Sequence, residues 1–112
     1  MKLYRVGEVC RRTGLSRKHL FQYKQIVPAV ATEYEGAYKL YDEEGLRKLE
    51  KIALLRQIGL HKPQILAILD DRGQERVLLL EQKQLLYKEM QRIEARLALL
   101  EETLESIDRE EE

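Results

Sequence analysis

The feature that most constrains the fold of this chain is a seven-residue hydrophobic repeat in its C-terminal third. One series recurs at every seventh position, and a second is offset from it by four residues and then three, as in the a and d positions of a coiled coil. Their hydrophobic members are Leu79, Leu86, Met90, Ile93, Leu97, Leu100, Leu104 and Ile107. Lys83 interrupts the series, and residues 74–112 contain neither proline nor glycine. The pattern predicts a long coiled-coil helix over residues 74–112.

A helix of this length is too long to pack only on its own chain. About 35 helical residues span roughly 52 Å, whereas a compact unit of about 72 residues is roughly 30 Å across. We therefore expect the a/d residues to pair with a second copy. The flanking charges slightly favour an antiparallel homodimer, which sets Glu89 against Arg96 twice. The alternative is one amphipathic helix that folds back on its own chain.

The N-terminal 28 residues have the pattern of two short helices joined by a turn. Residues 5–13 have helical spacing, and Gly14 suits the left-handed backbone that ends a helix. Ser16 is a natural N-cap for a second helix over residues 17–25. This arrangement is typical of a helix-turn-helix.

Residues 29–71 predict a small hairpin and two more helices. The hairpin lies within 29–41 and turns at Glu35-Gly36-Ala37. Asp42 caps a helix that runs to about Ile58, and a further helix covers about 62–71.

The chain has 20 basic and 20 acidic residues, but the two signs are segregated. Residues 1–69 are net +6 and residues 70–112 are net −6. A basic N-terminal part favours a polyanionic partner such as nucleic acid, and an acidic part is typical of a solvated extension. The two charged segments would also serve simply to keep two helical surfaces soluble. Charge alone therefore does not decide between a nucleic-acid partner and a purely solubilising role.

The composition offers little that supports catalysis or metal binding. Cys10 is the single cysteine, at a position that a short helix would bury, and there are two histidines. One thiol cannot supply the ligands of a zinc or iron–sulfur site, so we expect no metal and no cofactor. The sequence has no glycine-rich phosphate loop and no nucleophile beside a base, and we expect that it is not an enzyme. Without a membrane-length apolar run or a signal-peptide core, the default expectation is a reducing cytoplasm and no membrane partner.

The order of these parts resembles the MerR family of bacterial transcription regulators. Tyr4-Arg5-Val6-Gly7-Glu8-Val9 resembles the family's opening Y-x-I-G-E-V/A, and Thr13-Gly14-Leu15-Ser16 resembles its T-G-V-S turn. Gly36-Ala37-Tyr38-Lys39-Leu40-Tyr41 resembles the wing N-G-Y-R-x-Y, and Ile58-Gly59-Leu60-His61 resembles the x-G-F-S that opens the last helix of the DNA-binding domain. The match covers residues 4–71 in order, and the heptad region follows where the family has its dimerisation helix.

This resemblance implies a mainly α fold. Residues 1–72 would form a winged helix-turn-helix DNA-binding domain with a small β-hairpin wing, and residues 74–112 a long dimerisation coiled-coil helix. It implies a homodimeric regulator that binds palindromic promoter DNA and distorts it. RNA polymerase is a further candidate partner, and the bacterial cytoplasm, on the nucleoid, is the expected location. No effector domain follows the coiled coil, so we expect no small-molecule pocket of that kind.

Seven residues are predicted to contact DNA: Arg17, Lys18, Gln22, Lys24, Tyr38, Lys39 and Lys62. On the second helix, Arg17 can read guanine and Gln22 adenine, although a solvated helix face would have the same composition. The wing residues Tyr38 and Lys39 are assigned to phosphate by the resemblance. Lys62 begins a helix whose N-terminus would favour a phosphate. We expect His19 to pack or hydrogen-bond locally and Tyr23 to join the core, and Tyr41 fits either wing or core.

The chain departs from the family in the second helix and in the wing. Leu20-Phe21-Gln22-Tyr23-Lys24 replaces the usual L-R-Y-Y-E, which puts Phe21 where the family has an arginine that commonly contacts DNA. Thr32-Glu33-Tyr34-Glu35 stands where the wing usually carries arginines. These departures support an alternative function, a MerR-like protein-binding module of the co-chaperone modulator type that does not bind DNA.

Overall fold

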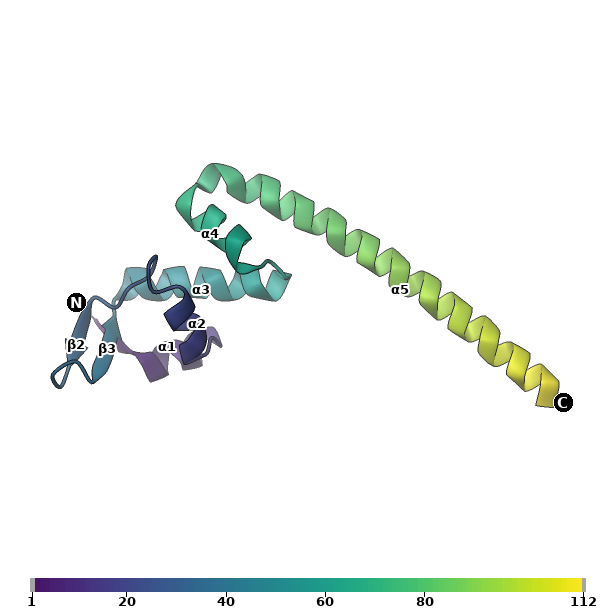
Figure 1. Cartoon of the computed structure of the whole chain (residues 1–112), viewed down its shortest axis with the longest axis horizontal. Coiled ribbons are helices and arrows are strands. Elements are labelled where there is room, and N and C mark those ends of the chain that lie inside the picture. The colour runs from purple at the N-terminus through teal and green to yellow at the C-terminus, as the bar shows by residue number, and fades with distance from the viewer. Residues whose placement is uncertain (1, 112) are drawn as a thin grey trace. The chain divides into compact units, whose positions relative to one another are not determined.

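The computed structural model describes residues 2–111, apart from the side chain of Arg72. Helices dominate it, with one small antiparallel sheet (Figure 1). In chain order the elements are β1 (Tyr4–Arg5), α1 (Val6–Thr13), α2 (Arg17–Gln22), β2 (Ala31–Glu33), β3 (Tyr38–Tyr41), α3 (Glu43–Ile58), α4 (Lys62–Asp70), the 3-10 turn η1 (Arg72–Gln74) and α5 (Glu75–Glu111). The mainly α fold with a hairpin and a long C-terminal helix is confirmed.

The chain divides into two compact units, and the boundary falls within α4. The first unit extends to Ile65 and contains the sheet and the helices α1, α2 and α3. The second unit begins at Leu66 and consists mainly of α5.

A three-residue turn joins α1 to α2, and its backbone is set by local interactions. Gly14 takes a φ of 79°, and its N–H donates to the carbonyl of Cys10 at 2.8 Å. The Thr13 hydroxyl donates to the carbonyl of Val9 and accepts the N–H of Leu15. Ser16 then caps α2 as predicted. The helix-turn-helix therefore follows from residues that lie next to each other in the sequence.

The second helix is shorter than the sequence predicted. It ends at Gln22 rather than near residue 25, and the chain continues in turns to Ile26. The N–H of Lys24 donates to the carbonyl of Phe21, and that of Ile26 to Tyr23, so the bonds tighten to the three-residue spacing typical of a helix end.

The sheet has three strands in the order β1-β3-β2, one more than the predicted hairpin. Tyr4 of β1 pairs with Tyr41 of β3, and Thr32 of β2 pairs with Lys39. The prediction that residue 5 begins the first helix is wrong: Arg5 ends β1 and precedes α1, and a two-residue strand has no periodicity of its own. The strand ties the N-terminus to the wing, which consists of β2, β3 and their connection.

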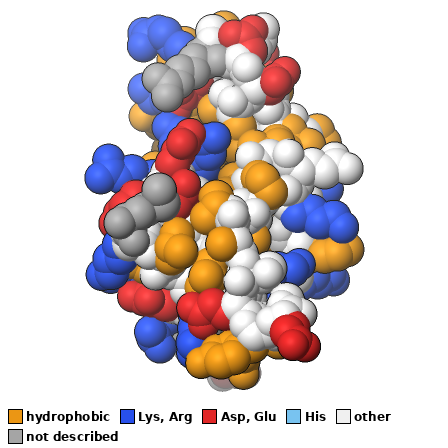
Figure 2. Space-filling model, turned by 90° about the vertical axis from the view of Figure 1, so that its left-hand side faces the viewer, with side chains coloured by type: hydrophobic (Ala, Val, Ile, Leu, Met, Phe, Trp, Pro, Cys, Tyr) orange, Lys and Arg blue, Asp and Glu red, His pale blue; other side chains and the backbone are white. Residues whose placement is uncertain are grey.

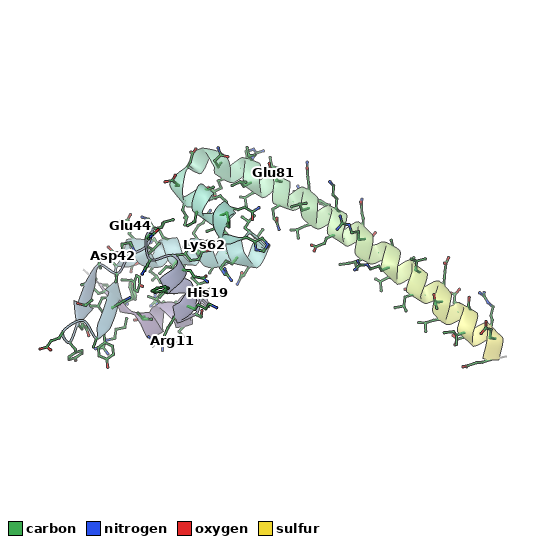
Figure 3. The ribbon with its side chains drawn as sticks, in the orientation of Figure 1. Arg11, His19, Asp42, Glu44, Lys62 and Glu81 are labelled. Atoms are coloured by element: carbon green, nitrogen blue, oxygen red, sulfur yellow. The ribbon has the colours of Figure 1, made fainter. Side chains whose placement is uncertain are left out.

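Helix α3 contributes more side chains to the core of the first unit than any other element does. Asp42 caps it by accepting the N–H of Gly45 at 2.8 Å (Figure 3), and Gly59 ends it with a φ of 103°. Helix α1 and strand β3 both pack against it. Its fully buried side chains are Leu46, Leu49, Ile52 and Leu55. They are joined in the core of the first unit by Tyr4, Val9, Leu15, Leu20, Tyr23, Val27, Leu40, Tyr41, Ala53, Leu60 and Ile65.

Helix α5 extends without interruption over 37 residues, about 56 Å at the usual rise per residue. Most of its a/d side chains are between 43% and 54% exposed, namely Leu86, Met90, Ile93, Leu97, Leu100, Leu104 and Ile107. Leu79 is partly buried. Within residues 2–111, no helix is both long and apolar enough to cross a membrane.

Replacing Leu49 by alanine should lower the free energy of unfolding by about 2–5 kcal/mol, because it leaves a cavity in the core. The same substitution at Leu54, which lies on the same helix and is 51% exposed, is the matched control. It should change the free energy of unfolding by less than about 1 kcal/mol. Urea denaturation followed by circular dichroism measures both, and equal losses would contradict the assignment of Leu49 to the core.

Candidate nucleic-acid interface

An open groove of about 1150 Å³ lies in the first unit and is lined by residues of β1, α1, α2 and the wing. Apolar side chains such as Leu20, Phe21 and Leu40 form part of its wall. Five basic side chains also line it, namely Arg5, Arg11, Arg17, Lys24 and Lys39, against the two acids Glu8 and Glu33. Figure 2 views the molecule from the side of β2 and β3, and lysines and arginines lie on both margins of a face that also exposes hydrophobic side chains.

The two acids of the groove are both neutralised by arginines. Glu33 accepts two hydrogen bonds from Arg5, from Nη2 at 2.7 Å and from Nε at 3.2 Å. Glu8 forms an i,i+4 ion pair with Arg12 at 3.4 Å. In the part of the chain that the structure describes, no ion pair involves the four remaining groove cations, Arg11, Arg17, Lys24 and Lys39. The groove therefore offers positive charge to a ligand, even though the whole chain is neutral.

The second helix presents a polar and basic face to solvent. Leu20 and Tyr23 point into the core, at 4% and 1% exposure. Arg17, Lys18 and Gln22 are exposed on the other sides of the helix. Tyr23 is thus a core residue as predicted.

The wing carries an aromatic and cationic cluster that the sequence analysis missed. The rings of Tyr34 and Tyr38 meet edge to face, with centroids 5.4 Å apart. The Arg5 guanidinium lies 5.2 Å from the Tyr38 centroid and 5.9 Å from that of Tyr34. Its hydrogen bond with Glu33 raises the pKa of Arg5, so the group stays charged. This cluster ties β1 to the tip of the wing, beside the groove.

The tip of the wing is a strained turn. Tyr34, Glu35 and Gly36 all have positive φ angles, 51°, 56° and 90°. The N–H of Ala37 closes the turn on the carbonyl of Tyr34 at 3.1 Å. A left-handed backbone at two non-glycine residues costs about 1–3 kcal/mol each, so the cluster of Arg5 and the two tyrosines helps to hold this conformation.

His19 positions the second helix through a reciprocal capping box. The Ser16 hydroxyl accepts the N–H of His19 at 3.2 Å, and the Ser16 N–H donates to Nδ1 of His19 at 3.0 Å (Figure 3 labels His19). Burial lowers the pKa of His19, and the charges of Arg56 and Lys18 add to this. The neutral ring is therefore favoured, in agreement with its role as an acceptor. The predicted local hydrogen bond of His19 is confirmed.

Lys62 is exposed at the first residue of α4. The preceding N–H, that of His61, already donates to Oε1 of Gln64 at 2.8 Å. A phosphate at this helix end would therefore meet the amides that follow and the Lys62 ammonium group.

All seven predicted contact residues are exposed, but the structure does not gather them at one place. Arg17, Lys24, Tyr38 and Lys39 line the groove. Lys18, Gln22 and Lys62 do not.

Tyr41, which the sequence assigned to either wing or core, lies on β3 of the wing, and its side chain is in the core, at 3% exposure. Cys10 is half-buried rather than fully buried as expected. Arg5 and Arg11 line the groove but were not singled out from the sequence. The net charge of +6 over residues 1–28 could have identified both arginines as candidate contact residues. Within residues 2–111, no cluster of three histidine, cysteine or acidic side chains could hold a metal ion.

Comparison with known proteins gives one family model that matches more than half of the chain. The model is described as "MerR HTH family regulatory protein" and matches residues 4–72. No solved structure gives a significant match.

Three similar proteins illustrate the relationship. The HTH-type transcriptional activator mta of Bacillus subtilis is 30% identical over 94% of this chain and 42% of its own length. The nodulation protein NolA of Bradyrhizobium sp. is 29% identical over 85% of this chain and 38% of its own length. The HTH-type transcriptional regulator ZntR of Escherichia coli K12 is 29% identical over 96% of this chain and 77% of its own length. The chain thus spans about two fifths of the first two relatives.

The capping box makes the stability of the first unit depend on pH. The pKa of His19 lies below its ordinary value of 6.5 in the fold, so its stabilising effect is present above about pH 6.5 and is lost as pH falls through the folded-state pKa. We expect the melting temperature of the wild type to fall between about pH 7.5 and about pH 5 more than that of His19→Gln. Glutamine retains a capping acceptor but does not titrate. His61 is common to both proteins, and parallel melting curves across this range would contradict the role of His19.

Proposed function

The chain belongs to the MerR family of helix-turn-helix regulatory proteins, and on this premise we propose that it is a homodimeric DNA-binding transcriptional regulator. The observation that carries the proposal is the groove between the helix-turn-helix and the wing, whose four cations have no acidic partner among the described residues. Cations without acidic partners can neutralise the phosphates of a DNA duplex, and an exposed helix beside them can enter one of its grooves.

In the proposed complex, α2 enters the major groove and the phosphate backbone follows the basic groove. Arg17 and Lys18 contact base edges or phosphates near the start of the helix, and Gln22 contacts a base from its end. Arginine pairs with two acceptors of guanine, and glutamine with the donor and acceptor of adenine. Lys24, which follows the helix, neutralises phosphate.

The wing provides the second proposed contact with the backbone. Tyr38 and Lys39 are exposed on β3 and line the basic groove. Their assignment is supported by the pairing of Glu33 with Arg5, because a neutralised carboxylate repels phosphate less. Glu33 is thus no obstacle to DNA binding at this position.

The a/d residues of α5 support the proposed dimer. Seven of them are between 43% and 54% exposed in a single chain, and apolar surface of that extent is typical of an interface. We propose an antiparallel pair that buries Leu79, Leu86, Met90, Ile93, Leu97, Leu100, Leu104 and Ile107 and sets Glu89 against Arg96. Residues 1–72 would then be the DNA-binding domain and residues 74–112 the dimerisation helix.

A two-fold dimer of this kind suits a palindromic promoter site. Bending or untwisting of that site costs energy that depends on its sequence, which would add specificity at positions that the protein does not touch. The names of two relatives, a transcriptional activator and a transcriptional regulator, support control of transcription, with RNA polymerase as the further partner proposed.

DNA binding by this chain should weaken steeply with salt, because each neutralised phosphate releases counterions. Fluorescence anisotropy with duplexes selected from a random library measures the dependence of affinity on salt concentration. Lys62→Glu should reduce affinity for all sequences alike and lower the logarithmic slope by about one for each protomer.

Lys88→Glu is the control for this experiment, because it makes the same charge change on α5 at a position outside the a/d series. It should leave the slope within error of the wild type. The absence of any saturable binding at low salt would refute DNA binding and favour the protein-binding alternative. Unchanged affinity of Lys62→Glu would refute only the contact made by Lys62.

The dimer should depend on Leu97 but not on Leu99. Leu97→Glu places a carboxylate in the a/d interface and should raise the dimer dissociation constant at least about tenfold, because that charge is desolvated. Leu99 is two residues away, lies outside the a/d series and is 64% exposed, so Leu99→Glu should leave the constant nearly unchanged. Analytical ultracentrifugation at micromolar concentration measures both. A wild type that stays monomeric, or equal effects of the two changes, would contradict the proposed pairing.

A further inference from the structure

An exposed phenylalanine stands on the face of α2 that carries the polar contact residues. Phe21 is 61% exposed, whereas its neighbours Leu20 and Tyr23 are nearly fully buried. Successive helix positions differ by 100°, which places Phe21 opposite the buried side and between Arg17 and Lys18 in angle. The fold gains little from this ring, because most of its surface remains in water.

One cation lies against the ring, and another lines the same groove. Nζ of Lys24 lies 4.1 Å from the ring centroid, close enough for a cation–π interaction that restricts both side chains. Arg17, one turn earlier on the same helix, lines the same groove wall. An apolar side chain with basic neighbours suits a ligand that combines phosphates with an apolar group.

DNA offers one such group in the major groove. Every base edge there presents hydrogen-bond donors or acceptors, but thymine alone also presents a methyl group, at C5. A phenylalanine side chain has no donor or acceptor for a base, so its attractive contact with an edge is with that methyl group.

We propose that Phe21 reads the 5-methyl group of a thymine in each half-site, as a specificity-determining residue. The inference rests on the proposed DNA binding and adds the identity of one base. Lys24 holds the ring in place and neutralises a neighbouring phosphate. Removal of the methyl group from one half-site should weaken binding about three- to tenfold, as expected for the loss of one buried methyl group.

The test uses the full chain and a duplex that it selects from a random library. Each thymine of that duplex is replaced in turn by deoxyuridine, which pairs identically but lacks the methyl group. For the wild type, one symmetric pair of positions should show the three- to tenfold loss. Phe21→Ala, which removes the ring from both protomers, should bind the thymine duplex more weakly by at least this factor and should no longer distinguish thymine from deoxyuridine there.

Two further variants keep the test selective. Phe21→Leu retains an apolar side chain and should keep most of the discrimination. Gln22→Ala removes the neighbouring exposed side chain and should still distinguish thymine from deoxyuridine at that position, whatever its affinity. Thermal unfolding confirms that each variant is folded, which we expect because Phe21 is exposed.

The possible outcomes separate this inference from the proposed function. If the wild type binds DNA with a steep salt dependence but tolerates deoxyuridine at every position, the methyl contact is refuted and DNA binding stands. If Phe21→Ala weakens binding equally for both bases, the residue has another role and the inference is also refuted. If the wild type binds no duplex at low salt, the proposed function fails first.

Discussion

Burial of one face of α3 is the interaction on which the rest of the first unit depends. Leu46, Leu49, Ile52 and Leu55 are all at most 2% exposed, and both α1 and β3 pack against this helix. A group of four such side chains contributes several kcal/mol from hydrophobic burial, which is comparable to the net stability of a small domain. The helix-turn-helix and the wing are the two sides of the candidate interface. Their relative positions within the first unit are therefore set by a hydrophobic core that contacts no ligand.

Short polar interactions then orient the exposed parts. Helix α2 has six residues, too few to be stable alone, and depends on the caps at its start and on the burial of Leu20. The Ser16–His19 capping box satisfies two backbone N–H donors at the end where Arg17 and Lys18 are presented. Stability of the cap and presentation of the contact residues are therefore linked, and a titrating histidine makes that link sensitive to pH.

Local charge, rather than net charge, decides what this surface can bind. The chain is neutral as a whole, yet pairing of Glu33 with Arg5 and of Glu8 with Arg12 leaves four groove cations without acidic partners among the described residues. At physiological salt, charges more than about 8 Å apart are largely screened, so a ligand in the groove responds mainly to the side chains that line it. The net charge of the N-terminal sequence segment predicted that this surface is basic. Only the ion pairs in the structure identify which of its cations remain available to a ligand.

The sequence by itself determined the features that arise from neighbouring residues: the turn at Gly14, the caps at Ser16 and Asp42, the end of α3 at Gly59 and the uninterrupted helix of the heptad region. Helical periodicity and capping operate within a few residues, so they can be read directly from the order of side chains. Only the tertiary structure decided that Tyr4-Arg5 forms a third strand, that Tyr41 is buried while Tyr38 is exposed, and that Arg5 neutralises Glu33 across 28 positions of sequence. These outcomes depend on pairings between distant segments, whose register is fixed when the core closes and which no local pattern encodes.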